Sequence, residues 1–195
     1  TGDGAGILIQ IPHLFFQKQS EKAGIKLPEA GRYAVGNVFL PSGKDTEQGQ
    51  QIMERAVVTE GLELLGWRDV PVDNTTIGVT ARSVEPVIKQ IFVGAGADIK
   101  DQLAFERRLY CVRKRTAWGV RRAGLNDNNE NFYACSLSSK TLIYKGQLMA
   151  PQLEPYYLDL KDPDMVSALA LAHSRYSTNT FPSWGRAQPF RYIAH

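Results

Sequence analysis

The stretch from His173 to Trp184 reads HSRYSTNTFPSW and follows an apolar run that predicts a buried strand. Its arginine, Arg175, falls at the end of that strand, where a charged side chain is costly unless an anion pairs with it. The planar guanidinium group suits bidentate binding of a carboxylate, and short hydroxyl and amide side chains follow it. The residues alone leave two alternatives open: a site for a small carboxylate ligand, or an internal salt bridge to an Asp or Glu side chain.

The histidines add neither a metal site nor a clear catalytic base to this arginine. His13, His173 and His195 have no spacing typical of metal ligands, so we predict no metal site. His173 precedes Arg175 by two residues, which places both side chains on one face of a strand. We interpret His173 as a hydrogen-bonded structural residue rather than a general base.

Working outward from this stretch, apolar runs and amphipathic segments alternate along the chain. Periodicity and turn signals predict strands over 7–11, 33–40, 62–70 and 87–93, and a further strand that ends near His173. They predict helices over 48–60 and 101–122, a short amphipathic segment over 13–18, and a short helix that starts at the Asp162-Pro163 pair. Residues 132–137 and 141–145 flank the polar turn 138–140, which predicts a β-hairpin.

The glycine-rich start, Gly2-Asp3-Gly4-Ala5-Gly6, precedes a predicted strand rather than a helix. Dinucleotide-binding and Walker loops place their glycines before a helix N-terminus, and no Gly-Lys-Ser/Thr follows here. We therefore interpret the segment as a tight turn at which two backbones approach closely, and not as a phosphate site.

The predicted helix 101–122 is basic and gives a rival functional hypothesis. Its cations are Arg107, Arg108, Arg113, Lys114, Arg115, Arg121 and Arg122, and its predicted buried face holds Phe105, Leu109, Val112 and Thr116. The cations are spread around the helix and Glu106 interrupts them, so we favour a solvated face with ion pairs. The alternative is a non-catalytic nucleic-acid-binding or regulatory module that uses this helix.

The overall composition is that of a globular protein. The chain has 195 residues, a net charge of +3 and 43% hydrophobic residues. The small charge gives no argument for nucleic acid as the main partner, and no apolar stretch approaches the roughly 20 residues needed to span a bilayer. The two cysteines, Cys111 and Cys135, are expected to be free thiols of an intracellular protein.

Both ends of the sequence lie beside apolar runs, over 5–11 and over 190–194. Termini of an intact domain are usually polar, so we expect residues 1–195 to be one partial domain that is truncated at both ends. Strands missing from such a domain would leave open sheet edges, and pairing with another copy of the chain is then expected.

Five stretches of the sequence, residues 1–7, 66–73, 132–139, 144–146 and 173–184, together resemble one family. On these motifs the chain resembles the glutaminase domain of the glutamate synthase large subunit, most of all the bacterial NADPH-dependent type. The resemblance implies an α+β fold, part of a four-layer αββα N-terminal-nucleophile hydrolase with two stacked, mainly antiparallel sheets. It also implies a type 2 glutamine amidotransferase, whose cysteine thiolate attacks the side-chain amide of glutamine to give glutamate and ammonia.

The resemblance also implies roles for single residues. Arg175 matches the arginine that holds the substrate α-carboxylate, and Ser177, Thr178 and Asn179 match residues of the pocket wall. His195 matches the residue before the Asn-Gly pair that forms the oxyanion hole. That pair, the cysteine nucleophile and the acidic residue for the substrate amine have no match in the chain. We therefore expect no catalytic residue here and no glutaminase activity from this chain alone.

The cofactors and most partners that the resemblance implies belong to other parts of a larger protein. Glutamine is the expected substrate, and its ammonia would pass through a tunnel to a flavin domain that aminates 2-oxoglutarate. The parent protein would carry FMN and an iron–sulfur cluster in the large subunit, and it would receive electrons from NADPH through a small partner subunit. For the chain itself we expect no cofactor, a cytoplasmic location, and neither nucleic acid nor membrane as a partner.

Overall fold

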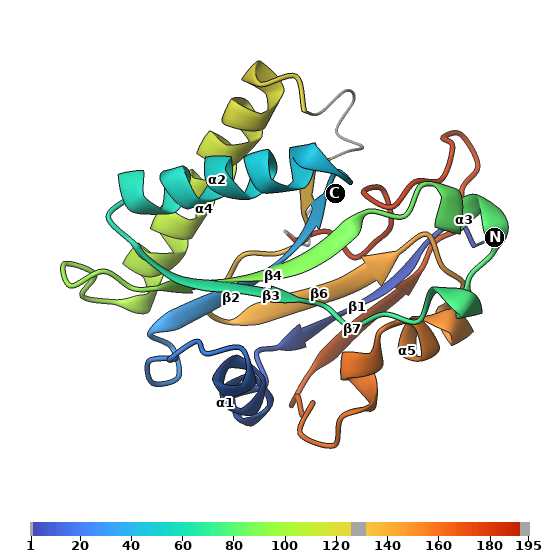
Figure 1. Cartoon of the computed structure of the whole chain (residues 1–195). Helices are drawn as coiled ribbons and strands as arrows, with labels where there is room; N and C mark the ends of the chain where they lie inside the picture. Colours follow the sequence, from blue (N-terminus) through green and yellow to red (C-terminus); the bar gives the residue numbers. More distant parts are fainter. Residues whose placement is uncertain (1, 126–131, 192–195) are drawn as a thin grey trace.

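Two antiparallel β-sheets face each other in the computed structural model, which describes residues 2–125 and 132–191 (Figure 1). The strands are β1 Ala5–Gln10, β2 Tyr33–Leu40, β3 Glu63–Asp69, β4 Val87–Gly94, β5 Tyr133–Ala134, β6 Thr141–Gly146 and β7 Ala170–Ser174. The α-helices are α1 His13–Lys22, α2 Lys44–Thr59, α3 Val79–Ser83, α4 Gln102–Arg122 and α5 Leu153–Tyr156, and short 3-10 helices cover Asn74–Thr76, Ala150–Gln152 and Leu158–Lys161. The strand order is β3-β4-β2-β5 in one sheet and β6-β1-β7 in the other.

The four-stranded sheet and the two long helices enclose one core. α2 and α4 lie across the outer face of this sheet, as Figure 1 shows. Val38 of β2 packs there with Met53 of α2 and Leu109 of α4, and all three side chains are fully buried. The predicted buried face of the basic helix is confirmed at all four positions. The helix begins where predicted, because the Asp101 side chain accepts a hydrogen bond from the Ala104 amide at 2.7 Å.

A second core fills the space between the two sheets and is rich in aromatic rings. Phe16 of α1 packs edge-on against Phe92 of β4, with ring centroids 5.5 Å apart. Trp184 inserts from the far end of the chain and meets the Phe39 ring at 5.8 Å. Because α1 and residue 184 both contribute to this core, segments from the two ends of the sequence stabilise the same interior.

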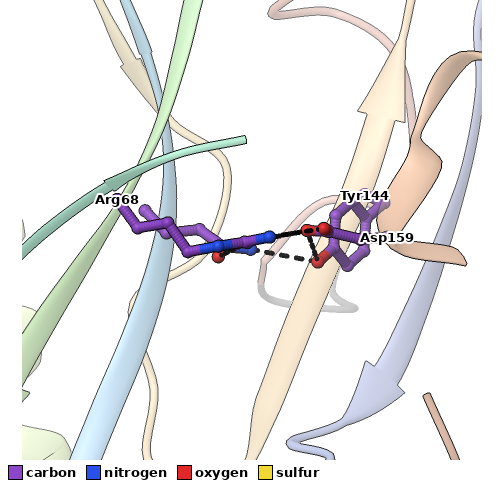
Figure 2. A network of polar contacts seen from close by, with 4 residues as sticks. Arg68, Tyr144 and Asp159 are labelled. Carbon is purple, nitrogen blue, oxygen red and sulfur yellow. Dashed lines mark hydrogen bonds and ion pairs between the residues drawn. The ribbon is translucent and has the colours of Figure 1, made fainter. Parts of the chain in front are cut away.

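A polar network is buried inside this aromatic core and joins the two sheets (Figure 2). Arg68 on β3 donates to the Asp159 carboxylate from two nitrogens, at 2.8 and 2.6 Å, and to the Gln90 side-chain oxygen at 2.6 Å. Tyr144 on β6 donates to the same carboxylate at 2.9 Å and accepts from the Gln90 amide at 3.0 Å. Burial and the Asp159 charge raise the pKa of Tyr144 well above its usual value, so the hydroxyl stays neutral and donates.

The glycine-rich start is a site of close backbone approach, as predicted. A side chain on Gly6 would place its Cβ 2.5 Å from the Gln188 carbonyl oxygen and 2.6 Å from the Lys145 Cβ. On the neighbouring strand, a Cβ on Gly146 would lie 2.5 Å from the Trp184 ring. Glycine is required at both positions because the chain after residue 184 lies directly on β1 and β6.

The predicted β-hairpin over 132–145 is wrong. β5 pairs with β2 in one sheet, whereas β6 pairs with β1 in the other. The chain stays beside β2 as far as Ser138, which pairs with Val35, before it enters the other sheet. Within this connection the Ser136 hydroxyl accepts from the Asn37 and Ile143 amides, both at 3.3 Å. The Asn37 side chain also donates to the Ile143 carbonyl at 2.8 Å. These buried polar side chains replace the ladder that a hairpin would have formed.

Two smaller predictions in the C-terminal third are also wrong. The Asp162-Pro163 pair starts a turn rather than a helix, because the Asp162 side chain accepts from the Asp164 amide at 2.9 Å. The strand that leads to Arg175 is exposed rather than buried at four of its five residues. This strand, β7, pairs with β1 on one side and is the edge of its sheet among the residues described here.

The fold class predicted from the sequence is confirmed: the chain is α+β, with two antiparallel sheets stacked on each other. Across residues 2–125 and 132–191, no helix is long and apolar enough to cross a membrane.

Candidate functional site

The loop after β7, residues 175–183, starts directly beside the turn that leads into β1. We call it the Arg175 loop. The Arg175 amide donates to the Gly4 carbonyl at 2.7 Å, and the Ser177 amide donates to the Asp3 carboxylate at 2.8 Å. Asp3 and Ser177 lie 174 positions apart in the sequence. The loop is therefore fixed at its start by a part of the chain that no local sequence pattern connects to it.

The guanidinium group of Arg175 is half supported by this loop and half unpaired. Its Nη2 donates to the Thr180 hydroxyl at 2.5 Å and to the Ser177 hydroxyl at 3.3 Å. Its Nη1 is buried and has no hydrogen-bond partner among residues 2–125 and 132–191. In the part of the chain that the structure describes, no ion pair joins Arg175 to an Asp or Glu side chain. Of the two alternatives from the sequence, the internal salt bridge is therefore not formed within these residues.

The other residues expected at the pocket wall lie in different positions relative to Arg175. Ser177 is half-buried and contacts the guanidinium group, and its hydroxyl also donates to the Thr180 carbonyl. Thr178 and Asn179 are exposed, and the described structure gives neither one a hydrogen bond to Arg175. Thr180, which the sequence analysis did not select, makes the shortest contact to the guanidinium group.

The histidines occupy three different situations. His173 is half-buried on β7 opposite Gly6, and its Nδ1 is buried without a partner among the described residues. The hydrogen bond predicted for this ring is therefore not found at Nδ1. His13 lies in α1, where its Nδ1 is 2.9 Å from the Tyr33 hydroxyl. His195, expected beside the oxyanion hole, lies outside the described residues.

Neither cysteine is placed as a nucleophile for this loop. Both are free thiols. Cys135 is buried, and burial raises the pKa of its thiol to about 12, which keeps it protonated and unreactive near neutral pH. Cys111 lies partly exposed on α4. Within the described ranges, no three His, Cys, Asp or Glu side chains gather in a group that could hold a metal ion.

The basic helix α4 presents its cations partly as ion pairs, as the sequence analysis favoured. Arg108 and Arg115 both contact the buried carboxylate of Glu60, the residue that directly follows α2. The exposed Trp118 ring lies under the Arg122 guanidinium group, 4.6 Å from the ring centroid. Tyr110 is covered in the same way by Arg113 at 5.1 Å. Each ring thus already has a cation on one face, which reduces the surface left for stacking a nucleic-acid base.

The whole chain, residues 1–195, matches the family of glutamine amidotransferases class-II. It is 48% identical over 197 residues to a glutamate synthase [NADPH] large chain of Bacillus subtilis, and 43% identical over 197 residues to that of Azospirillum brasilense. It is 44% identical over 206 residues to a glutamate synthase [NADH] of Saccharomyces cerevisiae. These matches cover 100% of this chain but only 12%, 13% and 9% of the respective relatives. With every residue of the chain inside one family match, the protein is a member of the class-II glutamine amidotransferases.

Proposed function

We propose that this chain is part of the glutaminase domain of a glutamate synthase, and that Arg175 binds the α-carboxylate of glutamine. The observation that carries this proposal is the buried Nη1 of Arg175, which has no partner among the described residues. The family membership and the glutamate synthase relatives support the reaction: hydrolysis of the glutamine side-chain amide to glutamate and ammonia. The ammonia then aminates 2-oxoglutarate elsewhere in the parent protein.

The geometry around Arg175 supports its role as an anchor. Thr180 and Ser177 hold Nη2 from one side, so the guanidinium plane is fixed before a ligand arrives. Nη1 is left to donate to a carboxylate oxygen, and a charge-assisted bond of this kind is stronger than a neutral one. Ser177, Thr178 and Asn179 form the wall beside that carboxylate in this proposal. The chain's own contribution to the reaction is therefore to bind and orient the substrate.

The nucleophilic cysteine and the oxyanion hole are placed by this proposal outside the 195 residues. The chain alone is then inactive, and incubating it with glutamine while measuring ammonia tests this directly. Ammonia release that Arg175→Ala abolishes would refute the assignment of the chemistry to other residues.

The redox cofactors are also placed in the remainder of the parent protein. The described residues do not fit an iron–sulfur cluster, because they offer no group of three or more Cys, His, Asp or Glu side chains. We place that cluster and FMN in the rest of the large subunit, NADPH oxidation on a small partner subunit, and the assembly in the cytoplasm. For the chain on its own, we propose that the exposed edge of β7 pairs with a second copy. A monomeric elution profile at high concentration would contradict that pairing.

The proposed role of Arg175 is tested in the whole protein of which the chain is a part. We expect Arg175→Ala to raise the KM for glutamine on the order of a hundredfold, because it removes charge-assisted hydrogen bonds to the substrate. Glutamate formation from added ammonium salt should stay within about twofold, since that route needs no glutamine. Arg121→Ala, at an exposed position of α4, serves as the control and should leave both activities unchanged. Equal losses with glutamine and with ammonium would overturn the assignment.

A further inference from the structure

We propose that Lys145 is a positioning residue for the Arg175 loop, because it holds the chain segment on which this loop ends. That segment, residues 184–188, is called here the return segment. The effect of Lys145 on glutamine rests on the proposed function, whereas its hold on the return segment is a separate claim. Nothing in the reaction proposed above uses this lysine.

Lys145 is a buried cation whose partners are backbone carbonyls rather than a carboxylate. The residue is 1% exposed, and its Nζ donates to the Gly185 carbonyl at 2.9 Å and to the Ala187 carbonyl at 2.6 Å. The ammonium group also lies over the Tyr133 ring, 4.3 Å from its centroid, and 5.1 Å from that of Phe190. No ion pair in the described ranges includes it. Carbonyl dipoles and ring faces therefore hold this charge in place.

The strand register places Lys145 close to the start of the same loop. Lys145 on β6 and His173 on β7 both lie opposite Gly6 of β1, so the three residues form one row across the sheet. The Gln188 carbonyl lies directly over Gly6. The return segment thus passes over β1 between Lys145 and His173. His173 lies on β7, two residues before Arg175.

Gly4 lies two residues before Gly6, on the same face, and it contacts both the return segment and Arg175. The Ala187 Cα lies 3.0 Å from where a Cβ of Gly4 would be, and the Gly4 carbonyl accepts from the Arg175 amide. Ala187 is also the residue whose carbonyl Lys145 binds at 2.6 Å. One short piece of backbone therefore connects the lysine to the glycine that fixes Arg175.

The Arg175 loop depends on its two ends because its middle is exposed. Residues 178–181 are all exposed, so packing contributes little to their conformation. The first end is fixed at Gly4 and Asp3, and the second by Trp184, whose ring nitrogen donates to the Ala81 carbonyl at 3.0 Å. Lys145 adds two bonds directly after that tryptophan.

The lysine is retained at a cost to the fold, which favours a positioning role over a stabilising one. Burial lowers the pKa of Lys145 to about 8, so the protonated form is disfavoured in this environment. Near neutral pH the amine is still mostly protonated and can give charge-assisted bonds to both carbonyls. A hydrophobic side chain of the same length would avoid the cost of burying a charge, but it would lose the hydrogen bonds to the Gly185 and Ala187 carbonyls.

The experiment compares Lys145→Met with Tyr157→Phe in the whole protein. Tyr157 donates to the Lys145 carbonyl at 2.6 Å, so Tyr157→Phe removes a buried hydrogen bond at the same residue and leaves the Nζ contacts intact. Two readouts are measured. One is the rate of limited tryptic cleavage after Arg175, the first residue of the loop, and after Arg186 in the return segment; the other is the KM and kcat for glutamine. For Lys145→Met we expect cleavage and KM each to rise on the order of tenfold while kcat stays within about twofold. Tyr157→Phe should change neither.

Each outcome decides one part of the inference. Unchanged cleavage in Lys145→Met would overturn the hold on the return segment. Faster cleavage with an unchanged KM would overturn the positioning of Arg175. If the unaltered protein does not use glutamine, the proposed function fails and the cleavage rate alone decides whether Lys145 holds the segment. Lys145→Gln, which keeps one amide donor, should give intermediate values, and loss of folding in both variants would show that the lysine is structural only.

Discussion

Two arginines of this chain, Arg68 and Arg175, show how differently the same side chain can be used. Arg68 lies between the sheets at 9% side-chain exposure and donates two nitrogens to Asp159, a carboxylate that is itself 3% exposed. Arg175 follows β7, which is the edge strand of its sheet among the described residues. Within these residues its guanidinium group contacts the hydroxyls of Ser177 and Thr180, and its buried Nη1 has no acceptor. A guanidinium group that is paired with a carboxylate of the protein itself, as in Arg68, joins elements of the fold. A guanidinium nitrogen without an internal acceptor, such as Nη1 of Arg175 within the described residues, agrees with the ligand-binding role proposed for that residue.

The largest expected effect concerns the ion pair between Arg68 and Asp159 and is a loss of folding stability. Arg68→Met should lower the free energy of unfolding by about 3–5 kcal/mol, because it leaves the Asp159 charge buried without its partner. Arg175→Ala should cost less than about 1 kcal/mol, since it removes no ion pair within the described residues. Urea unfolding of both variants measures the difference. Adding Asp159→Leu to Arg68→Met should recover most of the loss, and equal losses in the two arginine variants would remove the distinction.

Lys145 is intermediate between the two arginines, because it is a buried cation whose acceptors are backbone carbonyls rather than a carboxylate. We expect it to make the stability of the fold depend on pH. Its pKa is about 8 in the folded protein and 10.5 for the ordinary side chain, so between these values the unfolded chain binds more protons. The stability of the unaltered protein relative to Lys145→Met should therefore rise with pH in this window, by at most about 1.4 kcal/mol per pH unit. Urea unfolding at pH 7, 8, 9 and 10 checks the sign. A fall in the stability of the unaltered protein relative to Lys145→Met as the pH rises would show instead that Lys145 is held as a stabilising charge.

The smallest expected effect tests how the Arg175 guanidinium group is held by Thr180. Thr180→Val should raise the KM for glutamine about fivefold, because one hydrogen bond to the Arg175 guanidinium is worth roughly 0.5–1.5 kcal/mol. Thr80→Val is the matched control, at an exposed position of α3 outside the Arg175 loop, and it should leave the KM for glutamine unchanged. Steady-state kinetics of the whole protein with glutamine measure both. An unchanged KM in Thr180→Val would contradict the support of the Arg175 guanidinium group by Thr180.

The sequence predicted the elements whose pattern is local. The strand over 33–40 and the helix that ends at Arg122 have the expected bounds because periodicity and capping are encoded within each segment. Arg175 was also selected as a candidate site residue from the local sequence, residues 173–184. The features that were missed depend on residues far apart in sequence, such as Asp3 with Ser177 and Arg68 with Asp159, 91 positions apart. The hairpin prediction failed for the same reason, because buried contacts of Ser136 and Asn37 outweigh local turn chemistry.

The place of β1 in its sheet has a consequence for how the protein is made. This strand, residues 5–10, leaves the ribosome before the other strands described here, yet its neighbours are residues 141–146 and 170–174. At about 5–20 residues per second, β1 waits roughly ten seconds or more for its second partner to be synthesised. The four-stranded sheet can assemble β2, β3 and β4 with α2 and α4 once residue 122 has emerged. We therefore expect the apolar segment Ile7-Leu8-Ile9 to be the part of the nascent chain that is most exposed to chaperones and to aggregation.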